Sequence, residues 1–299
     1  MLKKLILVLI TFSSVLPAGP YAPPAGQPGS MAIYKDDITV WANSVVVERG
    51  FINIGEPVLG CVDYGSDANC LGHAEGEING VVSLGDGGMA TLSFQYPITN
   101  GDGNDFVVFE NSYSNTFLEL AFVEVSSDGN NFFRFNAVSL TDPNKQVGTF
   151  GSVDATNINN LAGKYQRGYG TPFDLQELAG IEGLDVNSIK YVRVIDVVGC
   201  IQSADFNNDG FVNFLDYSVF AAAYMSRTGE TGWNKKCDIA PPYDVINRVD
   251  LAEFTSQWLA ENWPSFDSLG NKINDPWPTP FSTGGFDLDA VGVIHQKKP

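Results

Sequence analysis

The stretch Asp205-Phe-Asn-Asn-Asp-Gly-Phe-Val-Asn-Phe-Leu-Asp216 places oxygen-bearing side chains at loop positions 1, 3, 5, 9 and 12, and glycine at position 6. Calcium is a hard cation that takes about six to eight oxygen ligands, and a short loop that turns sharply at its glycine can supply them. The residue after the glycine contributes its backbone carbonyl in loops of this kind. The sequence therefore predicts a Ca²⁺ site with the ligands Asp205, Asn207, Asp209, Phe211, Asn213 and Asp216.

A second copy of this pattern lies further along the chain. The segment Val212-Asn-Phe-Leu-Asp216 is echoed 34 residues later by Ile246-Asn-Arg-Val-Asp250. Apolar residues follow each copy at helical spacing, and Phe220 of the first run matches Phe254 of the second. A helix with its apolar residues on one face buries that face against a neighbour. We therefore expect two short helices whose apolar faces meet.

The second loop departs from the pattern of the first. The stretch Asp238-Ile-Ala-Pro-Pro-Tyr-Asp-Val-Ile-Asn-Arg-Val-Asp250 is one residue longer, lacks the glycine at position 6 and contains two prolines. Asp238, Asp244, Asn247 and Asp250 can still surround a metal, so we expect a second Ca²⁺ site that is weaker or differently shaped. The alternative is a degenerate loop that is kept for packing alone.

With these paired loops and helices, residues 203–263 resemble a type I dockerin. Asp216 carries part of the resemblance, because dockerins have a short carboxylate where ordinary EF-hands have glutamate. The resemblance implies calcium binding and docking to a cohesin-type partner on a scaffold or cell surface. Dockerins commonly use loop positions 10 and 11 in recognition, and these are Phe214 and Leu215 here. Exposure of both residues would favour docking, whereas burial against the rest of the chain would favour a calcium unit that only braces the protein.

Residues 31–200 predict β structure. Short runs of β-branched and aromatic residues alternate with turn residues, and Asp128-Gly129 marks a hairpin. Residues 140–188 predict a loop excursion with a short helix near Leu175 to Leu178. A last alternating run within residues 264–299, from Gly285 to Ile294, predicts a closing strand beyond the dockerin-like unit. The expected strands before that unit are 80–85, 89–94, 105–110, 118–125, 132–138 and 190–197.

The predicted fold class is mostly β: an antiparallel jelly-roll-like β-sandwich with an inserted pair of small helices. The runs VEVSSDGNNFFRF (123–135) and YVRVIDVVG (191–199) resemble the core of discoidin-type, galactose-binding-like sandwiches. Three further segments are similar to uncharacterised exported bacterial sandwich proteins: VSLGDGGMATLSF (82–94), NGDGNDFVVFEN (100–111) and GFDLDAVGVI (285–294). The resemblance implies an architecture and a binding surface, for which carbohydrate is one candidate ligand.

Acidic residues also gather within the predicted sandwich. Alternate strand residues share a face, so Asp287 and Asp289 are expected to point to the same side. One interpretation is a structural Ca²⁺ site, another is a sugar site with an aromatic platform, and a third is ordinary turns beside an edge strand. The acidic residues of this speculative site are Asp102, Asp105, Glu110, Asp287 and Asp289, and the candidate platforms are Trp41, Tyr113, Tyr169 and Trp277.

The start of the chain reads as an export signal. Two lysines precede a short apolar run that ends at Leu16, so residues 1–18 predict a signal peptide and residues 19–30 a Pro/Gly linker. No later stretch is long and apolar enough to span a bilayer. The protein is therefore expected to be secreted or held at the cell surface. Four cysteines in an exported chain predict two disulfides, Cys61–Cys70 and Cys200–Cys237, although the other pairings stay open.

Composition argues against several function classes. A net charge of −18 and an isoelectric point near 4.3 make nucleic acids and anionic membranes poor partners. The two histidines lack the spacing of a zinc site, and no serine elbow is present. We therefore expect a non-catalytic protein. The alternatives are an adhesin or structural surface protein, and a polysaccharide-degrading enzyme that depends on Glu110 or Asp287.

Overall fold

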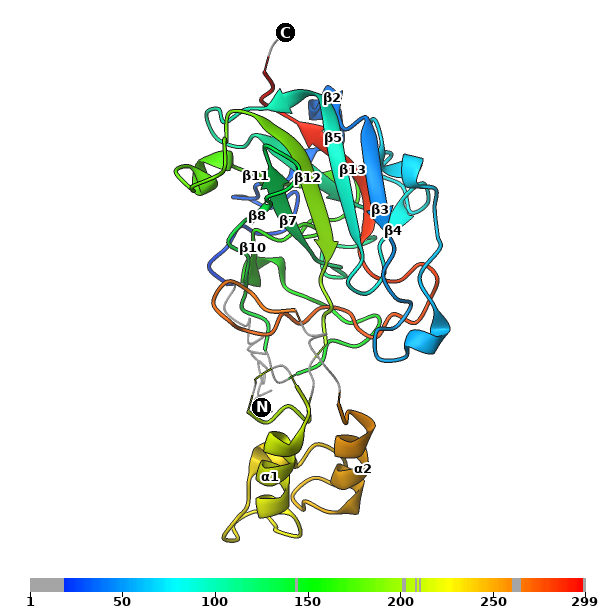
Figure 1. Cartoon of the computed structure of the whole chain (residues 1–299), viewed down its shortest axis with the longest axis vertical. Coiled ribbons are helices and arrows are strands. Elements are labelled where there is room, and N and C mark those ends of the chain that lie inside the picture. Colours follow the sequence, from blue (N-terminus) through cyan, green and yellow to red (C-terminus); the bar gives the residue numbers. More distant parts are fainter. Residues whose placement is uncertain are drawn as a thin grey trace, which may run out of the picture.

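A computed structural model describes residues 19–142, 145–200, 203–207, 209, 211–259 and 265–297. It shows a β-sandwich-like body above a small helical unit (Figure 1). The predicted mostly β fold is confirmed, because antiparallel sheets make up the body and the two α-helices of the described residues lie in the helical unit. The predicted signal peptide lies outside the described residues.

Two antiparallel sheets form the body. The first sheet runs in the order β1 (Ile33–Tyr34), β11 (Tyr169–Phe173), β6 (Phe106–Glu110), β13 (Asp287–Val293) and β2 (Val40–Trp41), with β4 (Val82–Ser83) also paired to β13. The second sheet runs in the order β3 (Ser44–Glu48), β5 (Met89–Ile98), β12 (Ile189–Asp196), β7 (Ala121–Ser126) and β8 (Phe133–Arg134). A separate pair consists of β9 (Val138–Ser139) and β10 (Ile158–Asn159).

The main hydrophobic core lies between these sheets. Phe106 and Val108 of β6 belong to the same buried cluster as Leu92 of β5 and Val192 of β12. Side chains two residues apart share a face of a strand, so each sheet turns one apolar face toward the other. The hairpin predicted at Asp128-Gly129 is present, since β7 pairs directly with β8.

The helical unit interrupts the sandwich between its last two long strands. β12 precedes the unit and belongs to the second sheet, whereas β13 follows it and lies between β6 and β2 of the first. Segments near residues 200 and 265 therefore both run to the helical unit (Figure 1). Along β13, Leu288 lies opposite Glu110 and Ala290 opposite Phe109, so Asp289 is the extra residue of a β-bulge.

The helical unit holds α1 (Phe214–Ala223) and α2 (Arg248–Ser256). Its own core is built around Phe220 and Phe254, whose rings stack with centroids 5.4 Å apart. The expected meeting of two apolar helix faces is therefore present. Among the described residues, neither helix has the length and apolar character that a membrane crossing requires. The short 3₁₀ helices are η1 (Lys35–Asp37), η2 (Pro57–Leu59), η3 (Asp67–Cys70), η4 (Ala155–Asn157), η5 (Leu175–Leu178) and η6 (Lys235–Cys237).

Two expectations about loops were wrong. The predicted excursion 140–188 contains β11, an integral strand of the first sheet, which its Gly170 and Pro172 had concealed. The predicted linker 19–30 packs on the sandwich, because the backbone N–H groups of Gly19 and Tyr21 donate to Thr156. The short helix expected at Leu175 to Leu178 is present as η5.

Neither predicted disulfide is present, and all four cysteines are free thiols. Packing separates the expected partners: Cys61 is exposed, whereas Cys70 belongs to the sandwich core. Cys237 belongs to the core of the helical unit, and Cys200 is buried at the end of the sandwich. Burial raises the pKa of both Cys70 and Cys237 to about 12, so these thiols stay protonated and unreactive at neutral pH.

Candidate metal centre

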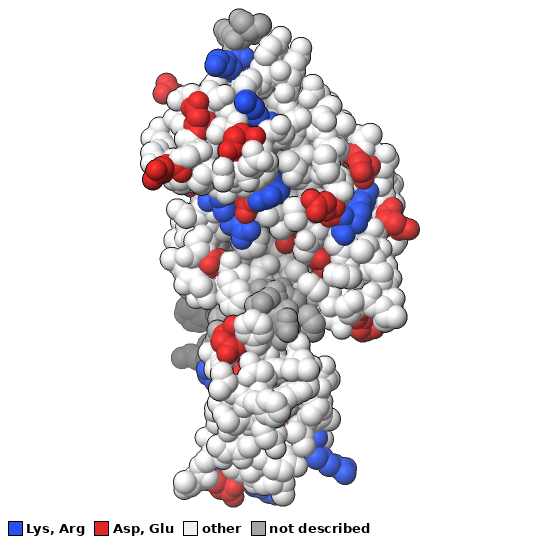
Figure 2. Space-filling model, in the orientation of Figure 1, with Lys and Arg blue, Asp and Glu red and all other residues white. Residues whose placement is uncertain are grey.

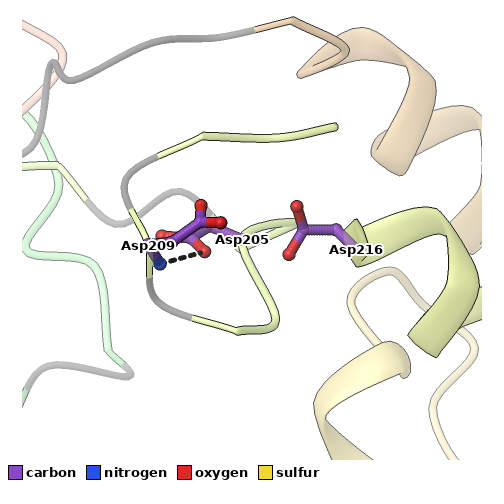
Figure 3. A group of neighbouring side chains, drawn as sticks. All are labelled: Asp205, Asp209 and Asp216. Carbon is purple, nitrogen blue, oxygen red and sulfur yellow. Dashed lines mark hydrogen bonds between the residues drawn. The ribbon is translucent and has the colours of Figure 1, made fainter. Parts of the chain in front are cut away.

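Three carboxylates converge in the first loop. One oxygen from each of Asp205, Asp209 and Asp216 lies within 4.8 Å of the others, and no other group of acidic, histidine or cysteine side chains in the described residues does so. Figure 3 shows Asp216 reaching from the start of α1 toward the other two side chains. Asp205 and Asp216 are buried, and Asp209 is exposed. Such a set of oxygens fits a hard divalent cation.

Asp216 is held in place by backbone N–H groups. Its Oδ1 accepts hydrogen bonds from Phe206 (2.8 Å) and Asn207 (3.2 Å), and its Oδ2 accepts one from Asn213 (3.0 Å). Asn213 in turn accepts from the N–H of Leu215, which completes a capping box at the start of α1. A carboxylate oxygen can accept more than one interaction, so these bonds leave Asp216 able to bind a metal. Asp216 thus joins the candidate site to the helix.

The remaining loop oxygens are arranged by local hydrogen bonds. The N–H of Asp209 donates to Asp205 Oδ1 (3.2 Å) and to Asn207 Oδ1 (3.0 Å), while the N–H of Phe211 donates to Asp209 Oδ1 (3.0 Å). These bonds gather the side chains of positions 1, 3 and 5 on one side of the turn. The glycine at position 6, Gly210, lies outside the described residues. Asn213, predicted as a ligand, serves as the helix cap.

A lysine from the sandwich reaches this loop. The Nζ of Lys272 lies 3.4 Å from Asp205 Oδ2, and both side chains are buried. Lys272 belongs to the segment that returns from the helical unit to β13. Its ammonium compensates part of the negative charge of the loop and would oppose a cation bound there. Sequence reasoning missed this residue, because the local pattern around Lys272 does not predict contact with a loop so distant along the chain.

In the second loop, backbone N–H groups hold Asp250 as they hold Asp216 in the first. Asp250 is fully buried, its Oδ1 accepts from the N–H groups of Ile239 and Ala240, and its Oδ2 accepts from Asn247. Asn247 has φ −144° and ψ −163°, and Asn213 has φ −143° and ψ −162°. The two helices therefore begin in the same way, with the same pair of residue types.

The two loop–helix halves of the helical unit are also joined by hydrogen bonds. The N–H of Met225, just after α1, donates to the carbonyl of Ile246 in the second loop (2.9 Å). The N–H of Leu259, after α2, donates to Val212 in the first loop at the same distance. Both residues adopt the left-handed backbone conformation, with φ of 68° and 63°. The order of each loop is therefore coupled to the end of the opposite helix.

The tip of the second loop differs. The N–H of Asp244 donates to Asp238 Oδ2 (2.7 Å), and Asp244 Oδ1 accepts from the Thr228 hydroxyl (3.0 Å). Asp238 Oδ1 is buried without a hydrogen-bond partner. Unlike the first loop, the carboxylates of Asp238, Asp244 and Asp250 do not meet at one point. The weaker second Ca²⁺ site stays a prediction, and the geometry gives it less support than the first.

The predicted recognition residues are exposed. Phe214 is 75% exposed and Leu215 60%, so neither is buried against the sandwich. The Phe214 ring meets Trp258 of the other half edge-on, with centroids 5.0 Å apart. Met225 and Leu259 add further exposed apolar surface to the unit. Figure 2 shows that the visible face of the helical unit carries few charged side chains.

The speculative acidic site of the sandwich is not assembled. Asp105 precedes β6 and Glu110 ends it, so their backbones lie roughly 16 Å apart along the strand. The carboxylate of Asp105 accepts from the N–H groups of Gly101 and Leu175 and contacts His295 Nδ1 at 2.8 Å. Asp102 is exposed. Asp102 and Asp105 therefore lie apart from Glu110, which is close enough to Asp287 and Asp289 for their charges to raise its pKa after burial has done so.

Asp287 and Asp289 form hydrogen bonds with different segments of the chain. Asp289 accepts from the N–H groups of Glu75 and Gly76, both at 2.9 Å. Asp287 accepts from the Ser83 hydroxyl and, at 3.2 Å, from Asn111 Nδ2. The bulge at Asp289 interrupts the strand period on which the expectation of a shared side rested.

The four candidate stacking platforms have different surroundings. Trp41 packs on Phe109, Tyr169 packs on Tyr34, and the Trp277 indole N–H donates to Asp86. Tyr113 is 55% exposed and lines a hollow in the sandwich that Glu119 also lines. Sequence reasoning missed Glu119. The available signal was a charged residue within the apolar run Leu118-Glu-Leu-Ala-Phe.

No family model matches the chain, and neither does any curated protein or solved structure. The resemblances to dockerins and to galactose-binding-like sandwiches therefore rest on the quoted residues alone.

Proposed function

We propose that the helical unit is a Ca²⁺-dependent docking module and that the sandwich is the part it carries. The observation that supports this proposal best is the convergence of Asp205, Asp209 and Asp216. Burial of a carboxylate is costly unless its charge is balanced, and the adjacent Lys272 balances only part of the charge of this group. A divalent cation held by these three side chains, together with Asn207 and the Phe211 carbonyl, would balance the rest.

Cation binding and helix order are coupled through Asp216. The carboxylates repel one another in the cation-free loop, and a bound Ca²⁺ ion would supply the charge that removes this repulsion. Asp216 also caps α1, and Val212 beside the loop accepts a hydrogen bond from the end of α2. Binding to the folded form alone stabilises that form by mass action. Both helices, and the surface they present, are thus expected to depend on Ca²⁺.

A cohesin-type protein on a scaffold or cell surface is the proposed partner. Phe214 and Leu215 are exposed at the start of α1, where the dockerin resemblance places recognition residues. Exposed aromatic and aliphatic side chains that are clustered in this way form the centre of many protein interfaces. Their exposure favours docking over the alternative of a calcium unit that only braces an adhesin.

The proposed setting is outside the cell, where Ca²⁺ is abundant and a docked sandwich can meet ligands. The sandwich is proposed as a binding surface, for which the resemblance suggests carbohydrate. A polysaccharide-degrading enzyme carried by the docking module is the alternative function. Turnover on a panel of polysaccharides, lost in Glu110→Gln or Asp287→Asn, would establish that alternative.

Calcium titration of the full chain tests the central proposal. Calorimetry is expected to show binding that Asp205→Asn weakens by at least about tenfold, because one charged ligand becomes neutral. Far-UV circular dichroism of the same samples should show a gain of helix as Ca²⁺ is added. Asp102→Asn, a change of an exposed acidic residue in the sandwich, is the matched control. Equal affinity in the Asp205 variant and the control would refute the assignment.

A further inference from the structure

A hollow of about 190 Å³ opens on the sandwich. Its walls come from the connection between β6 and β7, from the excursion near residue 150 and from the segment that leads into β13. Glu119 and Asp287 are its acidic lining residues, and no lysine, arginine or histidine lines it. Anionic ligands would therefore meet only like charge.

The two acidic lining residues differ in their partners, because Asp287 accepts hydrogen bonds from Ser83 and Asn111 and Glu119 accepts none from the described residues. Glu119 is 8% exposed, and its carboxyl forms no hydrogen bond with the described residues. Behind it, Glu110 is 1% exposed: its Oε2 accepts from the N–H of Ser112, and its Oε1 is buried with no partner in the part of the chain that the structure describes. Buried polar atoms are normally paired, so the carboxyl of Glu119 and the unpaired oxygen of Glu110 beside one hollow indicate that something else meets them.

The charges near Glu119 are of one sign. Burial raises the pKa of Glu119 well above its usual value, and four neighbouring acids raise it further: Asp287, Glu110, Asp275 and Asp196. Burial raises the pKa of Asp287 to about 6, while hydrogen bonds from Ser83 and Asn111 and, to a smaller extent, the charge of Arg49 act in the opposite direction. The Arg49 guanidinium is engaged by the carbonyls of Tyr64 and Ser83. The region therefore has an excess of acid over base.

Aromatic rings form a row along the same hollow. Tyr113 stacks on Phe117 (centroids 4.7 Å apart), Phe117 faces Phe150 (6.5 Å), and Phe150 faces Phe281 (6.2 Å). Phe150 is 73% exposed, and Tyr113 and Phe281 are about half exposed. The faces of aromatic rings carry partial negative charge and attract cations. Rings and carboxyl groups thus favour the same kind of ligand.

We propose that this hollow binds an organic ammonium group, with Glu119 and Asp287 facing the charge and the aromatic row contacting its carbon-bound hydrogens. A bare metal ion fits less well, because the carboxyl oxygens here do not converge as those of the first calcium loop do. A neutral sugar would stack on the rings but would leave the carboxyl groups without a counter-charge. An organic cation is large enough to contact groups that are spread over the walls.

The ligand should compete with protons. Because its neighbours are acidic and its site is buried, Glu119 holds a proton more tightly than a free carboxyl does. A bound cation favours the ionised form and so releases that proton. The other titratable groups that face this region are Asp287, Glu110, Asp275, Asp196 and Asp289. Binding is therefore expected to tighten as the pH rises, whereas a neutral sugar would gain nothing from the loss of protons.

Calorimetric titration of the full chain with tetramethylammonium, choline and propylamine, at pH 6 and pH 8, tests the proposal. Binding of at least one probe is expected, tighter at pH 8, with Glu119→Gln lowering the affinity at least tenfold and Phe150→Ala lowering it severalfold. Both variants are expected to fold, since Glu119→Gln retains the shape of the side chain and Phe150→Ala removes an exposed ring. Glu182→Gln, at an exposed loop, is the matched control.

Three outcomes would overturn the proposal: no binding of any of the three probes, equal affinity in Glu119→Gln and the control, or binding of glucose or galactose but not of the ammonium probes. Repeating the titration in EGTA separates this site from the calcium loop. Ammonium binding that survives EGTA, in the Asp205→Asn variant as well, supports the site whatever the fate of the docking proposal. Binding that EGTA abolishes would show that the hollow is not an independent site.

Discussion

The two loops of the helical unit start their helices identically, yet only in the first do three carboxylates of the described residues converge. Asp216 and Asp250 are both fully buried, and each accepts hydrogen bonds from three backbone N–H groups. At the loop tips the resemblance ends: Asp205 and Asp209 converge on Asp216, whereas Asp244 turns to Thr228. The difference teaches that the capping aspartate is a requirement of the fold, and that the convergence of carboxylates depends on the residues ahead of it.

The largest expected effect comes from removing either capping aspartate. In the absence of Ca²⁺, Asp216→Ala and Asp250→Ala should each destabilise the helical unit by roughly 3 kcal/mol, because each leaves buried N–H groups without an acceptor. Urea unfolding followed by circular dichroism measures this loss. With Ca²⁺ present the two variants should differ in stability, since Asp250→Ala keeps the first site intact and can still be stabilised by the ion. Equal stabilisation of both variants by Ca²⁺ would break the proposed difference between the loops.

The stoichiometry of calcium binding gives the next largest effect. Calorimetry should detect one site per chain that is at least about tenfold tighter than any second site, a difference of about 1.4 kcal/mol. Asp244→Asn should leave the tighter site within about twofold of its original affinity, because Asp244 belongs to the other loop. Two sites of equal affinity would mean that the second loop rearranges around the ion.

Sequence alone could predict that three carboxylates of the first loop meet, because they are close together along the chain. Asp205, Asp209 and Asp216 meet as their spacing predicted, and the strands with regular β-branched patterns are present. The failures share another cause. Lys272 approaches Asp205 from a distant segment, and the cysteines are separated by packing into different cores. Contacts between residues that are distant along the chain depend on how the sheets and helices are arranged. The local sequence pattern around each residue does not predict that arrangement.

Partner binding should depend on the first helix start more than on the second. Phe214→Asp is expected to weaken binding to a cohesin-type partner at least about tenfold, because it places a charge at the centre of the proposed interface. Val249→Asp, at the place on α2 that matches Leu215, should have a smaller effect, since Val249 is 40% exposed and Phe214 75%. Surface plasmon resonance with immobilised partner modules, in Ca²⁺ and in EGTA, measures both. A larger loss in the Val249 variant would move the docking surface to the second half.

The smallest effect concerns Lys272, which distinguishes the first loop from the second by contributing a positive charge. Lys272→Met is expected to raise the calcium affinity about threefold at low salt, because the ammonium 3.4 Å from Asp205 repels a cation bound to the same carboxylate. The same change should lower stability without Ca²⁺, since Asp205 then loses its positively charged neighbour. Lys235→Met, a change of an exposed lysine in the helical unit, is the control and should change neither quantity. Opposite shifts in affinity and cation-free stability would show that Lys272 compensates the loop charge when Ca²⁺ is absent. A fall in both would mean that Lys272 instead helps to position Asp205 for binding.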